Sequence, residues 1–355
     1  MNSSSTNVTV VIEYRDSFTK AVAKNVIVVV LSISINYINA GLIHTFCKHQ
    51  IFYTNPRYIL FIHLVVNDMI QMTLTVTLFV ISYTIYKFNV SICCTFILIA
   101  LFTTENTPLN LACMAVECYV AISLPLRHMQ ICTVRRTLML IGLIWATSML
   151  SVLPDLFITL ATEPLDFFHS RVFCLRETAF RNPHILKKRD TTYIIYLFIV
   201  WLIIFYTYFR IMFTAKTASK DAKKARNTIL LHGFQVLLCM ATYVEALLKQ
   251  ALRQWFPKNY TDCLFATYII VQILPRSISP IIYGVRDKTF RGYLKRYLIC
   301  RVKPQRQEMN SSSANVTVFI KYIVSFTKAV DKNVIVVVIN YITAGLIHTY
   351  CKHQV

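Results

Sequence analysis

Residues 114–128 read MAVECYVAISLPLRH, and they end one of the longest apolar runs of the chain. Two side chains break the apolar pattern here, because Glu117 and Tyr119 stand where the run finishes. An apolar run that ends in charged and aromatic residues is typical of a membrane helix at the water interface. We therefore predict that the chain crosses a membrane and that this stretch lies at one face of it.

The composition also favours a membrane protein. Of the 355 residues, 56% are hydrophobic and 15% are charged, and the mean hydropathy is +0.53. A soluble domain is seldom so apolar. The net charge of +21 would also suit a nucleic-acid-binding protein, but the sequence has no basic–aromatic interleaving, no Gly-rich phosphate loop and no cysteines at zinc spacing. We expect no nucleic-acid partner, no metal, no cofactor and no enzymatic activity.

Seven apolar runs are long enough to cross the hydrocarbon core of a bilayer, which takes about 20 helical residues. They cover residues 26–46, 58–84, 94–122, 138–161, 192–213, 228–248 and 264–283. The runs lack the alternation of a membrane β-barrel, and an isolated strand in lipid would leave its backbone polar groups unpaired. The sequence thus predicts an all-α fold, a bundle of seven membrane-spanning helices.

Glycosylation signals indicate the orientation of this bundle. Asn-x-Ser/Thr sequons occur at Asn2 and Asn7 before the first run, at Asn89 between the second and third, and at Asn259 between the sixth and seventh. With seven spans all four fall on one side, and only an external side makes them usable acceptors. Basic residues at 216–226 and 286–296 fit an inner side, although the loop expected at 171–189 is basic too. We predict residues 1–25 to be an extracellular N-terminal segment.

The chain after the seventh run contains two further features. Residues 287–298 (DKTFRGYLKRYL) place aromatic and apolar side chains on one helical face and basic ones on the other, as in a helix that lies along a lipid surface; an ordinary basic tail is the alternative. This segment closes the predicted receptor domain, residues 26–300, and residues 301–308 form a linker.

Residues 309–355 repeat residues 1–51 at most positions but lack a counterpart of residues 31–34. The deletion shortens the apolar run to 334–347 and leaves Asn340 inside it, which is too short to span a bilayer comfortably. We interpret this copy as a partial duplication without function. A functional C-terminal module is the less favoured alternative.

Four motifs in order carry a resemblance to a known family. They are PRYILFIHLVVNDM at 56–69, TENTPLNLACMAVECYVAISLPLRH at 104–128, KARNTILLHGFQVLLCM at 224–240 and PRSISPIIYGVRDKTFRGYL at 275–294. Together they resemble the fish odorant receptors of the rhodopsin-like class. The resemblance implies a small odorant ligand, a heterotrimeric G protein as partner, and a plasma-membrane location in olfactory cilia.

The resemblance assigns the coupling switch to Glu117, Cys118, Tyr119, Pro280 and Tyr283. Relatives carry arginine where this chain has Cys118, and that arginine pairs with the acidic neighbour. We therefore expect Glu117 to lack its partner and coupling to be weakened. The alternatives are a translated receptor that no longer signals and, less favoured, a channel or transporter.

Two further pairs of residues are predicted, one inside the bundle and one at its outer end. Asp68 would be a carboxylate at mid-membrane depth, which is costly unless it finds a partner, and Arg276 is the best candidate; the alternative is that Arg276 faces a water cavity. The resemblance also implies a disulfide from Cys93 or Cys94 to Cys174, with Cys93 the better fit, or else unpaired thiols.

Polar residues within the apolar runs form the candidate ligand site. They are Glu105 and Asn106 in the third run and Tyr243 and Glu245 in the sixth. A pocket between helices with a few placed polar groups suits a small ligand, and two carboxylates would favour amines or other polar odorants. Taken singly, each residue is more readily explained by a hydrogen bond between helices than by a ligand contact.

Overall fold

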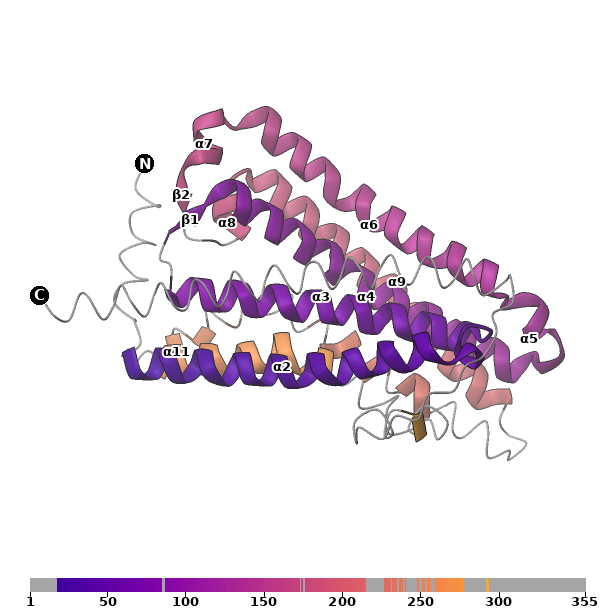
Figure 1. The fold of residues 1–355 in the computed structure, drawn as a ribbon. Helices are drawn as coiled ribbons and strands as arrows, with labels where there is room; N and C mark the ends of the chain where they lie inside the picture. The colour runs from indigo at the N-terminus through magenta and orange to yellow at the C-terminus, as the bar shows by residue number, and fades with distance from the viewer. Residues whose placement is uncertain are drawn as a thin grey trace, which may run out of the picture.

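A computed structural model gives the arrangement of the chain. It describes residues 18–84, 87–172, 174, 176–214, 227–230, 232–234, 236–238, 240, 248, 251–252, 254–256, 259–277 and 292–293. Among these residues the fold is a bundle of long helices that run side by side (Figure 1).

Five helices within the described residues are long and apolar enough to cross a membrane. They are α2 (Phe18–Lys48), α3 (Pro56–Thr84), α4 (Val90–Ser123), α6 (Val134–Thr162) and α9 (Pro183–Thr214). Each contains one of the first five predicted runs. At 1.5 Å per residue each exceeds the thickness of the hydrocarbon core.

The last two predicted spans are described in part. Helical residues occur at 227–230, 232–234 and 236–238 in the sixth run. In the seventh, α11 (Tyr260–Tyr268) continues into a π-helical turn, η3 (Ile269–Ile273), and helix follows to residue 277. The described residues thus give a helical membrane bundle. Tyr243, Glu245, Pro280 and Tyr283 lie outside them.

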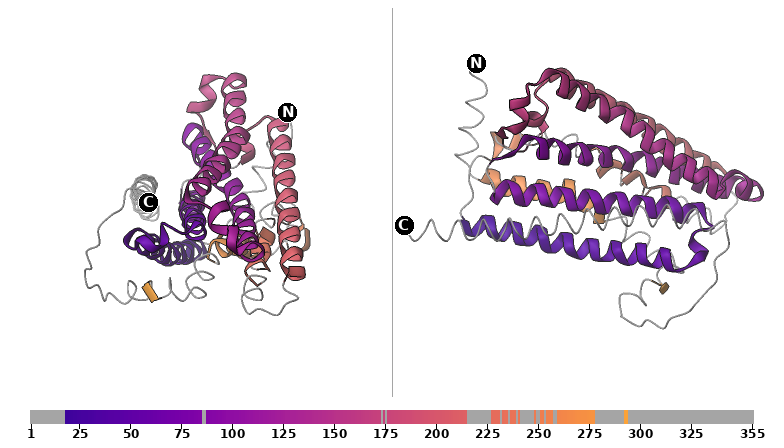
Figure 2. Two further views of the ribbon diagram at one scale, coloured as in Figure 1. Left: turned by 90° about the vertical axis from the view of Figure 1, so that its right-hand side faces the viewer. Right: turned by 45° about the horizontal axis from the view of Figure 1, so that its top comes forward.

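Short elements cap the two ends of the bundle (Figures 1 and 2). At one end β1 (Phe88–Asn89) pairs antiparallel with β2 (Arg171–Val172), next to α7 (Leu165–His169) and α8 (Arg176–Ala179). At the other end lie η1 (Gln50–Phe52) and α5 (Pro125–Ile131). The β pairing was not predicted, because two-residue strands leave no periodic pattern in the sequence.

The interior forms around α3 and α4, and α3 packs against α2, α4 and α6. Large side chains such as Phe46, Phe61, Leu64 and Leu111 are fully buried there. The outer faces of α6 and α9, in contrast, expose many large apolar residues, among them Leu150 at 77% exposure. Apolar side chains on both faces are expected of helices with lipid on one side and protein on the other.

The segment after the seventh run is described only at residues 292–293. The ring of Tyr293 lies 4.0 Å from that of His49 and 5.8 Å from that of Phe52, measured between centroids. Tyr293 therefore packs at the same end as η1, as a helix lying against this membrane face requires. The rest of that predicted helix, the linker at 301–308 and the duplicated segment at 309–355 lie outside the described residues.

Candidate functional site

A charged cluster lies between α6 and α9. Asp155 of α6 is fully buried, and its Oδ1 lies 3.0 Å from Nζ of Lys188. Its Oδ2 pairs with Nη2 of Arg189, which is 4% exposed. Both lysine and arginine belong to the second turn of α9, where the sequence analysis expected a loop. The correction has a physical reason: Asp155 pairs with both bases, so the helix can begin before these charges and the buried Arg189 is compensated inside the bundle.

Glu105 of α4 also belongs to this cluster. Its Oε1 accepts a hydrogen bond of 3.0 Å from Ser151 Oγ, one turn of α6 before Asp155. Glu105 is 3% exposed and interacts electrostatically with Arg189, Asp155 and Lys188. Three buried atoms in the cluster have no hydrogen-bond partner among the described residues: Glu105 Oε2, Arg189 Nε and Arg189 Nη1. The sequence analysis found Glu105 but missed Arg189, whose only signal was a charge beside an apolar run.

Asn106 occupies a different position, within a polar network between helices. Its Oδ1 accepts a 2.7 Å bond from Ser148 Oγ, and its Nδ2 donates to Asn67 Oδ1 at 3.5 Å. Asn67 in turn donates to Thr107 Oγ1 at 2.9 Å. Both polar ends of Asn106 thus connect α3, α4 and α6, which favours the structural alternative for this residue. Its contact with a ligand stays a prediction.

The predicted Asp68–Arg276 pair also stays a prediction. Asp68 is 1% exposed and Arg276 is 5% exposed, so both charges are inside the bundle. Arg276 donates to the carbonyl of Gln272, one turn earlier in the same helix.

A disulfide joins Cys93, in the first turn of α4, to Cys174. It lies at the end of the bundle that holds β1 and β2, where Ser91 Oγ also donates to the carbonyl of Phe168 at 2.9 Å. Cys94 is buried and free, with its Sγ 3.7 Å from the carbonyl of Ala179. Of the two cysteines considered, the structure thus uses Cys93, and the bond ties the segment after α7 to α4.

Two predicted glycosylation sites lie at this same end. Asn89 caps α4, and its side chain accepts a 2.9 Å bond from the backbone N–H of Ser91. Asn259 precedes α11 and is exposed. Asn2 and Asn7 lie outside the described residues.

At the opposite end of the bundle, Glu117 has two partners in place of the arginine that relatives carry at position 118. Arg57 Nε lies 3.4 Å from its Oε2, and His128 Nε2 lies 3.2 Å from its Oε1. Arg57 Nη2 also donates to Sγ of Cys118 at 3.3 Å. A guanidinium from the first turn of α3 thus lies beside the position where relatives carry arginine. The sequence analysis missed it because Arg57 precedes Glu117 by 60 residues.

Tyr119 lies on another side of α4. Its ring contacts that of Tyr206 in α9, with 6.2 Å between centroids, and it interacts with Arg210 of the same helix. Glu117 and Tyr119 thus connect the end of α4 to different neighbours. The other two switch residues, Pro280 and Tyr283, lie outside the described part of the chain.

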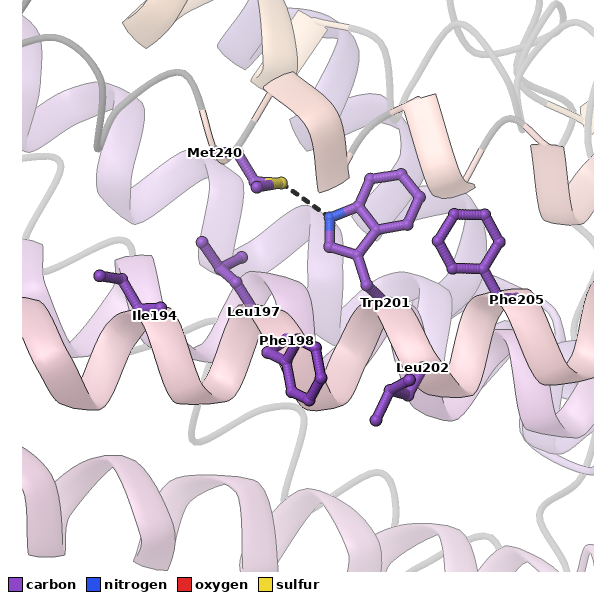
Figure 3. Close-up of a pocket in the computed structure, with 7 residues that line it drawn as sticks. All are labelled: Ile194, Leu197, Phe198, Trp201, Leu202, Phe205 and Met240. Carbon is purple, nitrogen blue, oxygen red and sulfur yellow. Dashed lines mark hydrogen bonds between the residues drawn. The ribbon is translucent and has the colours of Figure 1, made fainter.

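An apolar cavity of about 340 Å³ lies along α9 (Figure 3). Six residues of α9 line it together with Met240, and Trp201 Nε1 donates to Met240 Sδ at 2.7 Å. The lining residues are Ile194, Leu197, Phe198, Trp201, Leu202, Phe205 and Met240. They offer almost no polar group that could orient a small ligand. The charged cluster is therefore the better candidate for specific recognition.

Comparison with known proteins identifies the family. Residues 38–283 match the family model of the seven-transmembrane receptors of the rhodopsin family. The chain is 30% identical over 271 residues to odorant receptor 131-2 of Danio rerio, an alignment that covers 75% of this chain and 83% of the relative. It is 27% identical over 206 residues to olfactory receptor 8U8 of Homo sapiens, covering 54% of this chain and 61% of the relative.

The family match spans the five long helices except about the first two thirds of α2, and it reaches to the end of the seventh predicted span. The helical bundle, the apolar outer faces and the disulfide at the start of α4 agree with this match. The chain is therefore a multi-pass membrane protein that belongs to the rhodopsin family of seven-transmembrane receptors, as an odorant receptor of the teleost type.

Proposed function

We propose that this receptor binds a small polar odorant between α4, α6 and α9 and passes the signal to a heterotrimeric G protein. The observation that supports the ligand site is the buried cluster around Glu105, in which charged atoms remain without partners among the described residues. In a bundle surrounded by lipid such atoms are costly. A polar ligand that supplies the missing hydrogen bonds would therefore gain free energy there.

The mechanism would be a shift between two conformations of the bundle. A ligand changes such an equilibrium only by binding one conformation more tightly than the other. The cluster joins three helices, since Glu105 belongs to α4, Ser151 and Asp155 to α6, and Lys188 and Arg189 to α9. A ligand between them would favour one spacing of these helices, and α4 would carry the change to Glu117, Cys118 and Tyr119 at the far end.

The orientation and the location belong to the same proposal. The end with Asn89, Asn259 and the disulfide would face outside, and the end with α5 would face the G protein. A site in the plasma membrane of olfactory cilia would bring the outer end to water-borne odorants. The duplicated residues 309–355 would take no part in signalling.

Surface expression combined with a ligand-evoked cyclic-nucleotide response tests this function. A response without intrinsic current supports the receptor. An ion current from the purified protein in planar bilayers would support a channel instead. Protein that reaches the surface, binds probes and never signals would support a decayed receptor, for which Cys118 in place of arginine is the specific observation.

A further inference from the structure

We propose that Glu105 and Arg189 recognise the two ends of an amphoteric odorant, a small molecule that carries both an ammonium group and a carboxylate. This inference rests on the proposed odorant-binding function and narrows the class of ligand. The two side chains come from α4 and α9 and meet the same face of α6.

The hydrogen bonds of the cluster leave some of its charged atoms without partners among the described residues. Both oxygens of Asp155 are engaged, by Lys188 and by Arg189. Glu105, in contrast, uses Oε1 for Ser151 and has no donor for Oε2 among the described residues. Arg189 uses Nη2 for Asp155 and leaves Nε and Nη1 without acceptors there. The site therefore lacks a donor for Glu105 Oε2 and acceptors for two nitrogen atoms of Arg189.

The guanidinium of Arg189 is also held in place. Its Cζ lies 5.1 Å from the centre of the Phe180 ring, and Phe180 is itself fully buried. Together with Asp155 this contact limits how far the side chain can turn to find another acceptor. Fixed donors of this kind are suited to a carboxylate, which accepts charge-assisted hydrogen bonds from a guanidinium.

Helix α6 holds the partners of both side chains, Ser151 for Glu105 and Asp155 for Arg189, and so sets their spacing. Residues four apart on a helix have Cβ atoms about 5–6 Å from each other. The partners of Glu105 and Arg189 thus lie about one helical turn apart on α6, and the electrostatic interaction between Glu105 and Arg189 agrees with side chains that approach each other. A single small molecule can reach both only if its own charged groups are close together, as on one carbon or on neighbouring carbons.

Charge balance decides between ligand classes. The cluster holds two acids, Glu105 and Asp155, and two bases, Lys188 and Arg189, so its formal charge is zero. A simple amine or a simple carboxylate would add one net charge inside the bundle and leave one of the unmet groups unpaired, and both are costly at low dielectric. An amphoteric molecule adds no net charge and satisfies both groups.

Lys188 provides the connection to the surface. Its side chain is 43% exposed while Asp155 is 1% exposed, and its Nζ approaches the carbonyl of Ser151 at 3.4 Å. The cluster therefore runs from a solvated lysine at the end that holds the disulfide to the buried Glu105. A charged ligand would meet Lys188 first and the unmet groups of Arg189 and Glu105 afterwards.

The test measures binding to the full-length receptor in lipid nanodiscs, by the shift of its thermal unfolding midpoint, together with the cellular response. The probes are the twenty common amino acids, the amine that lacks the carboxylate of each, the acid that lacks the amino group of each, and neutral alcohols. We expect at least one amino acid to bind about tenfold or more tightly than both of its singly charged analogues, the size of one lost hydrogen bond to a charged group.

Three variants locate the effect. Glu105→Gln and Arg189→Lys should each reduce the preference for the amino acid about tenfold, whereas Lys187→Gln, an exposed neighbour on α9, should leave it unchanged. Arg189→Lys keeps a positive charge for Asp155 and removes the extra donors. It is thus preferable to Arg189→Gln, which would leave Asp155 with Lys188 alone.

The other outcomes are equally decisive. A receptor that prefers an amine, an acid or an alcohol overturns the amphoteric class but keeps the odorant-receptor function. A preference for amino acids that survives both cluster variants overturns the assignment to Glu105 and Arg189. If no probe of any class shifts the midpoint or evokes a response from protein at the cell surface, both the inference and the proposed function fail.

Discussion

At the scale of single residues, Arg57 changes the interpretation of Cys118. Glu117 is buried, with 7% of its side chain exposed, and a buried carboxylate needs compensation. Arg57 and His128 supply it from two other elements, so this one acid ties α3, α4 and α5 together. The loss of arginine at position 118 therefore leaves Glu117 partnered, and Cys118 fills the space beside it.

The first prediction is that Arg57→Ala destabilises the receptor more than the loss of a surface charge. Without Arg57 the carboxylate of Glu117 keeps only His128, and an unmet hydrogen bond to a charged group costs about 1–3 kcal/mol. The unfolding midpoint of the purified receptor should fall, and signalling without ligand should rise if the three elements separate more easily. Arg135→Ala, an exposed residue near the start of α6, is the matched control.

The double variant Arg57→Ala/Cys118→Arg tests whether the loss of a positive partner for Glu117 causes the destabilisation. A guanidinium at position 118 would stand where Arg57 Nη2 now meets Cys118 Sγ, so it should restore stability in the absence of Arg57. In the presence of Arg57 the same substitution brings two positive charges together and should help much less. Equal effects of Cys118→Arg in both backgrounds would show that the two positions act independently.

Charged residues inside the bundle also show what a sequence can predict about a site. Asp68 and Glu105 were found from the sequence because an acid within an apolar run needs a partner or a function, and Glu117 was found from the family resemblance. Arg57 and Arg189, their counterparts or neighbours, could not be assigned, since a base at the edge of a run is ordinary there. Which base approaches which acid depends on helix packing that one-dimensional periodicity does not encode.

At the scale of elements, the sequence analysis placed the starts of two helices too late for the same reason. The prediction started the first and fifth spans at residues 26 and 192, whereas α2 begins at Phe18 and α9 at Pro183. Lysines and an arginine lie in the added turns, and a hydropathy criterion treats such residues as loop. In the structure these charges have acidic partners on neighbouring helices: Asp262 for Lys24 and Asp155 for Arg189. The apolar cores of the spans were predictable, and their charged ends were not.

The contact between α2 and α11 gives the element-scale prediction. Lys24 Nζ lies 2.8 Å from Asp262 Oδ1, and the hydrogen bond from Lys24 lowers the pKa of Asp262 below its usual range. A carboxyl group with a lowered pKa stabilises the fold above its ordinary pKa and loses this effect as the pH falls. Lys24→Met should therefore lower the unfolding midpoint at pH 7 by about 1–3 °C.

The pH dependence is the check on this cause. The difference between wild type and Lys24→Met should shrink as the pH falls below the usual carboxyl range, because Asp262 is then protonated in both. Lys20→Met is the control, since Lys20 approaches the same carboxylate only at 3.5 Å and is largely exposed. A difference that persists in acid would mean that Lys24 acts through packing, for example against Phe265, whose ring centre lies 5.6 Å from Nζ.

At the scale of the whole molecule, the two ends of the bundle are held together by different means. One end has a disulfide and a β pairing, Cys93 to Cys174 and β1 to β2. The other has the ion pairs of Glu117 and the ring of Tyr293 against His49. Ion pairs also occur at the first end, as between Asp155 and Lys188. The covalent bond that holds this first end in addition favours movement at the other end, which is where a G protein would bind in the proposed orientation.

The last prediction concerns this orientation. If the disulfide end faces outside, Asn259 should carry a glycan, because it is exposed ahead of α11. Asn89 should be modified less completely, because its side chain caps α4 and bonds to Ser91. Asn259→Gln should then remove one glycan from nearly all of the receptor made in animal cells, and Asn89→Gln from only a fraction of it. Gel mobility before and after enzymatic deglycosylation measures both, and Asn182→Gln, which alters no sequon, is the control.

The opposite orientation would give a different result. If neither variant changes the mobility while a sequon engineered into the segment between α5 and α6 becomes glycosylated, the bundle is inserted the other way round. The cluster at Glu105 and Arg189 would then open to the cytoplasm.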